Sequence, residues 1–183
     1  MGRARLLSAV VADSEVYDKA KWHYGADNFP SALPEEQGFV HTGMFIAWLV
    51  LHEMLDPKWE ADTRAEVDLL RHRQSTGPQL FEAIDGVFLS EMLTDRGNAF
   101  TRAYFDFDRG GYLEDYRATI GPGLPTLYHV TDSWANYDRL AAVIDRRYAA
   151  WIEAGQPSVW KPPRTSWENL SVIGRALVAR LRR

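Results

Sequence analysis

The residues most able to do chemistry in this chain are histidines and acids between Asp18 and His52. His41 and His52 are 11 residues apart in a segment with helical spacing, and so share one face of it. They would nevertheless lie about 16 Å apart along the helix, so they cannot bind the same metal ion. A metal site or a general base would need His41 together with His23, and an acid such as Asp18 or Glu36.

Imidazoles near tryptophan also have an ordinary structural use. Each ring can donate to a backbone carbonyl and pack beside a Trp, and we favour this interpretation for His23, His41 and His52. We therefore expect no metal and no cofactor. If the chain is an enzyme, His23 and His41 are its candidate catalytic residues, and their metal-binding or general-base use stays open as the alternative.

Several catalytic classes lack their motifs. His52 and Glu53 begin like the zinc-protease helix motif, but Asp56 stands where its second His is needed. The chain has no cysteine, which excludes thiolate nucleophiles, thiolate metal sites and disulfides. A Gly-rich phosphate loop and a GxSxG elbow are also missing from the sequence.

Acidic and aromatic residues gather around Gly110 and Gly111. Their spacing does not fit a calcium loop, because the fifth, sixth and twelfth positions from Asp106 hold Gly110, Gly111 and Arg117. Acids and tyrosines together suit a contact surface for a basic partner, and a solvated loop is the alternative. The predicted binding surface consists of Asp106, Asp108, Tyr112, Glu114, Asp115 and Tyr116.

Helical spacing and capping residues dominate the rest of the chain. The strongest helix starts are Asp56 before Pro57, the capping box from Thr76 to Gln79, and Asp132-Ser133 before Trp134, each placing a capping side chain before a periodic segment. One short segment, 127–130, is a candidate for extended structure. The expected helices cover 34–51, 58–74, a segment from Thr76, a segment after Thr94, 112–120, 134–153 and 164–183.

These elements predict an all-α fold, a single compact bundle of about seven helices with little or no strand. We divide the chain into an N-terminal arm or helix at 1–12, a helical domain at 13–154 and a Pro-rich linker at 155–163. A basic, amphipathic C-terminal helix at 164–183 is expected to pack on the core. The longest apolar run has eight residues and ends at His52, whereas a membrane span needs about 18, so we expect no membrane span.

The segment 17–48 reads YDKAKWHYGADNFPSALPEEQGFVHTGMFIAW. It resembles the signature of a family of small bacterial proteins of unknown function, and the resemblance continues through GNAFTRAYFD at 97–106, YLEDY at 112–116 and LYHVTDSWANYD at 127–138. The resemblance covers most of 16–152. It implies membership of a family but does not indicate which reaction, if any, the protein catalyses. The residues assigned a structural role in this signature are Tyr17, Asp18, Trp22, Tyr24, Trp48 and Trp134.

Charge is distributed unevenly along the chain. Its net charge is −4, but 1–12 and 161–183 together carry +7, which leaves −11 on the remainder. An acidic body repels nucleic acid and favours a basic protein surface. We therefore do not expect a nucleic-acid partner for the body of the chain, and the sequence does not indicate an oligomeric state.

The hypothesis that fits these features best is a non-enzymatic, cytoplasmic protein-binding module. Its most concrete form is an immunity-type protein that neutralises a cognate toxin through an acidic, aromatic-rich surface. One alternative is an enzyme centred on His23 and His41 that binds a metal or a small ligand. A third hypothesis is an adaptor that binds nucleic acid or a membrane through the basic helix at 164–183.

Overall fold

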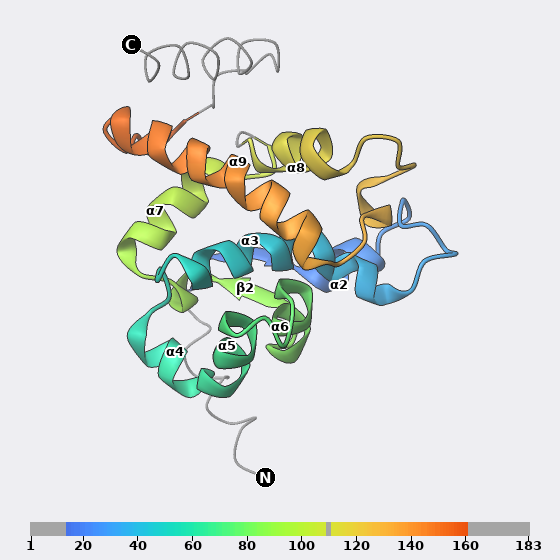
Figure 1. The fold of residues 1–183 in the computed structure, drawn as a ribbon, viewed down its shortest axis with the longest axis horizontal. Coiled ribbons are helices and arrows are strands. Elements are labelled where there is room, and N and C mark those ends of the chain that lie inside the picture. The colour runs from blue at the N-terminus through green and yellow to red at the C-terminus, as the bar shows by residue number, and fades with distance from the viewer. Residues whose placement is uncertain (1–13, 109–110, 161–183) are drawn as a thin grey trace, which may run out of the picture.

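The computed structural model describes residues 14–108 and 111–160 (Figure 1). Its α-helices are α2 (Ala20–Tyr24), α3 (Val40–Leu51), α4 (Pro57–Asp62), α5 (Arg64–Arg71), α6 (Gly77–Ala83), α7 (Asp95–Tyr104), α8 (Tyr112–Ile120) and α9 (Trp134–Glu153). Two strands and three 3-10 turns complete it, namely β1 (Val16–Lys19), η1 (Glu35–Phe39), β2 (Val87–Leu89), η2 (Ser90–Met92) and η3 (Leu127–His129).

The predicted all-α class is confirmed, since helices dominate and the strands form one small antiparallel sheet. The extended segment expected at 127–130 is wrong, because Leu127–His129 forms the 3-10 turn η3. The expected arm at 1–12 and the expected basic helix at 164–183 lie outside the described residues, as does the adaptor surface assigned to that helix. No helix in 14–108 or 111–160 has the length and apolar character that crossing a membrane requires.

Helix α3 is the centre of the core. Every residue from Val40 to Val50 is buried, as expected for a helix with apolar residues on nearly all sides. Helix α9 crosses one side of α3, and α5 and α6 pack against the other side (Figure 1). At the contact with α6 the two backbones nearly touch, because Gly43 and Gly77 have no side chain to separate them.

The single helix expected at 58–74 is two helices in the structure. Asp56 caps the first as predicted, its carboxylate accepting from the amides of Lys58 and Trp59 at 2.9 and 3.0 Å. Thr63 then interrupts the helix, because its hydroxyl donates to the Trp59 carbonyl and its backbone leaves helical geometry. The cap predicted at Ser133 is confirmed, since its hydroxyl accepts from the Asn136 amide. Thr94 caps α7 in the same way, accepting from the Gly97 amide.

Helices α7, α8 and α9 are joined by a buried ion pair. The Asp115 carboxylate accepts two hydrogen bonds from Arg147, at 2.7 and 2.8 Å, and a third from the Tyr104 hydroxyl at 2.8 Å. Removing one partner would leave the carboxylate with a charge in an apolar setting.

We expect Arg147→Ala to lower the free energy of unfolding by about 3 kcal/mol, because Asp115 would lose its counter-charge. The neighbouring Arg146 is exposed, so Arg146→Ala should change stability by less than about 0.5 kcal/mol. Urea denaturation of both variants measures this difference. Equal stabilities would mean that the pair contributes little to the packing of α8 on α9.

Candidate functional site

Three polar side chains from different elements meet beside the start of α3. Asp18 lies on β1, where pairing with β2 places it opposite Phe88. Helix α2 follows directly and carries His23, and His41 is the second residue of α3. The corner between β1 and α2 is held by the Ala20 amide, which donates to the Gly86 carbonyl at 2.9 Å. A strand, a short helix and the central helix thus direct one residue each to a common point.

The distances within this cluster are short. The Nε2 atoms of His23 and His41 are 3.1 Å apart, and His23 Nε2 lies 2.9 and 3.0 Å from the two carboxylate oxygens of Asp18. His41 Nε2 lies 4.0 Å from the nearer oxygen of Asp18. One potential ligand atom from each residue therefore falls within 4.8 Å of the other two.

The cluster is almost enclosed by the fold. Asp18 is 0% exposed and His41 1%, whereas the side chain of His23 keeps 15% of its surface exposed. The Thr42 hydroxyl donates to the Asp18 carboxylate, and the Tyr128 hydroxyl lies 3.3 Å from His23 Nδ1. Thr42 and Tyr128 thus orient Asp18 and His23 from behind, as outer-shell partners do in metal sites.

The hydrogen bonding at His23 Nε2 cannot be fully satisfied by one proton. A ring nitrogen carries either one hydrogen or one lone pair, yet this nitrogen faces both Asp18 and His41. A hydrogen directed at one of them is poorly aligned for the other, and a lone pair there would repel the carboxylate. A cation at the centre would accept lone pairs from all three residues at once.

Burial and neighbouring charges keep these ligands in the forms that bind metal. Burial, assisted by the neighbouring His23, lowers the pKa of His41 to about 3 against an ordinary 6.5, so this ring is neutral at pH 7. For Asp18, burial raises the pKa, but the hydrogen bond and charge of His23 outweigh it, with smaller contributions from His41 and Thr42. The net effect is a lowered pKa. Metal ligands must be deprotonated, and these two already are.

The low pKa of His41 predicts acid sensitivity of the metal-free protein. The unfolded chain binds a proton at this residue near pH 6.5, but the folded protein does not until about pH 3. Stability is therefore fully present above pH 6.5 and is lost as the pH falls. Each pH unit corresponds to about 1.4 kcal/mol, so we expect a loss of about 2–3 kcal/mol between pH 6.5 and 4.5.

Urea denaturation of wild type and His41→Gln across this pH range measures the effect. Glutamine cannot take up the proton, so the variant should lose about 2–3 kcal/mol less stability than the wild type between pH 6.5 and 4.5. Other titrating groups are the same in both proteins, so their contributions cancel in the comparison. The pKa of Asp18 is also lowered in the folded protein, so protonation of its carboxylate destabilises the fold further. That loss of stability occurs only at more acidic pH, below the ordinary pKa of 3.8. Parallel curves for the two proteins would contradict a neutral, buried His41.

The three potential ligand atoms lie close enough together to surround one metal ion. A tetrahedral ion with bonds of about 2.0–2.1 Å to nitrogen and oxygen has ligand atoms about 3.3 Å apart. With Asp18 Oδ2 as the carboxylate atom, the observed separations of 3.0, 3.1 and 4.0 Å fall on both sides of this value. Small side-chain movements would therefore place Asp18, His23 and His41 around one ion.

Comparison with known proteins identifies the family of this chain. The model of a family described as a domain of unknown function, DUF7832, matches residues 16–130, which include Asp18, His23 and His41. The chain belongs to the DUF7832 family. The comparison with curated proteins gave no match, and neither did the comparison with solved structures.

The DUF7832 domain brings together the histidine pair that the sequence left as an alternative. The favoured interpretation, a ring donating to a backbone carbonyl beside Trp, is right for His52, whose Nδ1 lies 2.8 Å from the Trp48 carbonyl and whose ring stacks on Trp48. His23 and His41 differ from this interpretation, because His23 forms its hydrogen bonds with the side chains of Asp18, Tyr128 and His41. Of the two acids considered, Asp18 joins the cluster, whereas Glu36 lies exposed on η1.

The predicted acidic surface is only partly exposed in the DUF7832 domain. Tyr112 and Tyr116 are fully buried, and Asp115 is buried in its ion pair with Arg147. The expectation that these three side chains face a partner is therefore wrong, because this face of α8 packs on α3 and α9. Asp108 and Glu114 are exposed and Asp106 is half-buried, so their use in binding stays a prediction.

The signature residues pack in different ways. The Tyr17 hydroxyl donates to Asn98 at 2.7 Å, and the Tyr24 ring stacks on Phe39. Trp48 is fully buried, and its indole N–H donates to Asp145 at 2.8 Å. These residues hold the N-terminal segment and α9 against the core.

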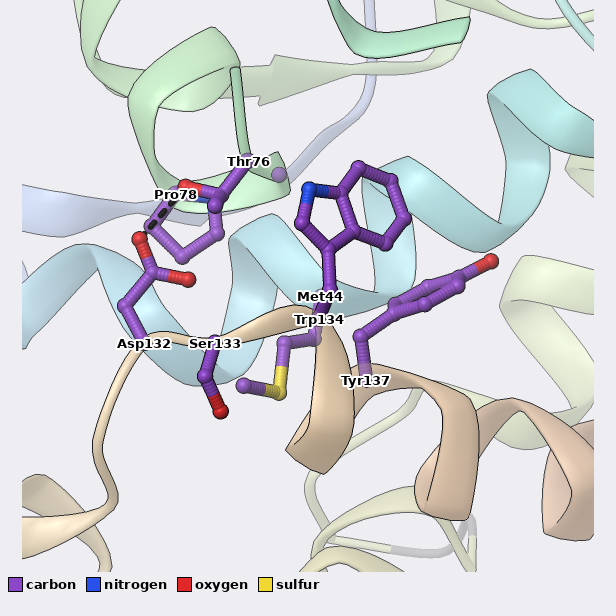
Figure 2. Close-up of a pocket in the computed structure, with 8 residues that line it drawn as sticks. Met44, Thr76, Pro78, Asp132, Ser133, Trp134 and Tyr137 are labelled. Carbon is purple, nitrogen blue, oxygen red and sulfur yellow. Dashed lines mark hydrogen bonds between the residues drawn. The ribbon is translucent and has the colours of Figure 1, made fainter. Parts of the chain in front are cut away.

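Two signature tryptophans lie nearer the surface. Trp22 is 52% exposed, with the Lys19 ammonium 5.4 Å from its ring centroid. Trp134 is half-buried beneath the guanidinium of Arg73 and lines a small pocket with Met44, Asp132 and other residues (Figure 2). That pocket has room for about one water molecule, so it is not a substrate site.

Three residues around the cluster were not selected from the sequence as site residues. Thr42 is adjacent to His41 in the chain, but neither its type nor its position indicates a bond to Asp18. Tyr128 contacts His23 across 105 residues, and the ring centroid of Phe107 lies 6.0 Å from that of His23. No local pattern predicts such contacts, which depend on how η3 and the turn after α7 pack against α2.

Proposed function

We propose that this chain is a metal-dependent protein whose site is formed by Asp18, His23 and His41. The observation that carries the proposal is the convergence of one nitrogen or oxygen from each residue within 4.8 Å. The three atoms belong to an acid and two imidazoles, which are ordinary ligands of divalent transition metals.

The number of protein ligands supports a reactive site over a purely structural one. Structural zinc sites usually have four protein ligands, whereas catalytic sites have three and keep a position for water or substrate. Two histidines and one carboxylate also suit ferrous iron with open positions. A divalent ion bound here would act as a Lewis acid on a ligand, while Thr42 and Tyr128 hold Asp18 and His23 in position.

Metal analysis of the purified protein tests this proposal. We expect one equivalent of zinc per chain after dialysis against zinc, and none after chelation. Zinc at about 100 times its Kd should stabilise the fold by about 2.7 kcal/mol, measured by denaturation with and without the metal. Failure to retain Zn²⁺, Co²⁺ or Fe²⁺ above the level of a protein without such a cluster would overturn the proposal.

A second candidate function is toxin neutralisation in the cytoplasm by an immunity-type contact. The observation that favours it is Phe107, a large apolar side chain that is 38% exposed beside the exposed acid Asp108. Exposed aromatic and acidic residues together suit the basic surface of a partner. Of the predicted surface residues, Glu114 would also be available to such a partner.

Co-expression with a toxin encoded beside the gene tests this second candidate. We expect growth to be rescued by the wild type and lost with Asp108→Lys. The matched control is Asp62→Lys, which makes the same charge change at an exposed position of α4. A toxin that stays lethal in the presence of the wild-type chain would count against the immunity function.

A further inference from the structure

We propose that the open position of the metal binds a small anion, a carboxylate or phosphate group, carried on a flat apolar body. This inference rests on the metal site proposed above and adds the chemical class of its ligand. Three features support it: the site is open beside His23, the rings of Phe107 and Tyr128 flank that opening, and the charge there is positive when the metal is bound.

Access to the cluster is limited to the side of His23. Asp18 and His41 have almost no exposed surface, and Thr42 covers the carboxylate of Asp18 from within the core. His23 is the ligand whose side chain reaches solvent, with 15% of its surface exposed. A ligand that reaches the metal must therefore pass beside the ring of His23.

Aromatic rings flank the two imidazoles. The ring centroid of Phe107 lies 6.0 Å from that of His23 and 5.9 Å from that of His41. The Tyr128 ring lies 6.1 Å from each imidazole and also packs against Phe29. Because Phe107 is 38% exposed, it offers apolar surface next to the opening. Such surfaces favour a ligand with a flat apolar part.

The charge at the site favours an anion. Two neutral imidazoles and one carboxylate leave a net charge of +1 once a divalent ion is bound. Arg117 lies on α8 with its side chain exposed, and its positive charge lowers the pKa of both His41 and Tyr128. A guanidinium recognises carboxylate and phosphate groups through paired hydrogen bonds.

Asp108, the exposed acid next to Phe107, opposes this field only weakly. Asp108 is exposed to solvent, where its charge is screened, and its amide donates to the Asp106 carboxylate within the same turn. With a divalent ion bound, the metal and its three ligands carry the net charge of +1 given above.

Visible absorption of the Co²⁺-loaded protein tests the inference, because it reports ligands that enter the metal's coordination. We expect benzoate and phenyl phosphate to change the spectrum saturably, acetate to bind more weakly, and uncharged benzamide to have no effect. Arg117→Gln should weaken benzoate binding about tenfold through loss of a charged hydrogen bond. Phe107→Ala should weaken benzoate while leaving acetate unchanged.

The matched control is Lys58→Gln, which removes one positive charge from α4, on the far side of the fold from α2 and α8 (Figure 1). It should leave anion binding unchanged. If the Co²⁺ spectrum forms but none of the anions alters it, or if Arg117→Gln binds benzoate like the wild type, the ligand class is wrong and the metal site stands. If Co²⁺ does not bind, both proposals fail.

Discussion

Replacing His23 by alanine is expected to abolish specific zinc binding. Loss of an outer-shell partner alone typically weakens metal affinity about 10–100-fold, so loss of one of three ligands should weaken it by more than about 100-fold. Competition with a chromophoric chelator measures the Kd. Because His23 is the most exposed of the three ligands, the metal-free variant should still fold, which circular dichroism can verify.

Two further variants distinguish a ligand from a structural histidine. His72→Ala removes an exposed imidazole at the end of α5 and should bind zinc like the wild type. Tyr128→Phe removes the hydroxyl beside His23 Nδ1 and should weaken binding about tenfold, an intermediate effect. Wild-type zinc affinity in His23→Ala would refute the assignment of His23 as a ligand.

Gly43→Ala is expected to cause a large loss of stability, because the added methyl group would collide with the backbone of α6. A Cβ at this position would lie 2.4 Å from the Pro78 nitrogen and 2.7 Å from the Gly77 carbonyl carbon, both backbone atoms of α6. Helices α3 and α6 would have to separate. We expect a loss of about 3 kcal/mol or more, measured by urea denaturation.

Gly123→Ala separates this steric effect from the general effect of replacing glycine. A Cβ at Gly123 meets nothing within 4 Å, but its φ of +83° is unfavourable for alanine. That variant should lose only about 1–2 kcal/mol. Since Gly43 follows Thr42, movement of α3 should also weaken zinc binding in Gly43→Ala. Stability close to that of the wild type would show that the two helices can separate without cost.

Helix starts were predictable because they depend on neighbouring residues. Asp56 before Pro57 and Ser133 before Trp134 each satisfy amide groups of the first turn, which no distant residue needs to supply. The break at Thr63 was missed because a threonine is compatible with both a continuing helix and a bond to the carbonyl four residues earlier. The strand pair was missed because β1 and β2 are short and about 70 residues apart in the chain.

Burial was harder to predict than helix type. Tyr112, Asp115 and Tyr116 fall on an amphipathic helix beside exposed acids, so their composition alone suits a surface. The structure buries them because α8 packs on α9, the Tyr112 hydroxyl donates to the His41 carbonyl of α3, and Arg147 supplies the counter-charge for Asp115. A partner 32 residues away in the chain decides which side of α8 faces the core.

The sequence by itself determined the helical class, the main helix caps and the exclusion of a metal shared by His41 and His52, since all three follow from spacing along one segment. It also supplied His23, His41 and Asp18 as residues that could meet. Only the tertiary structure decided that they do, because β1, α2 and α3 are placed by pairing with β2 and by packing around Trp48 and Phe45. Such long-range contacts are set by the whole core and leave no periodic signal in the chain.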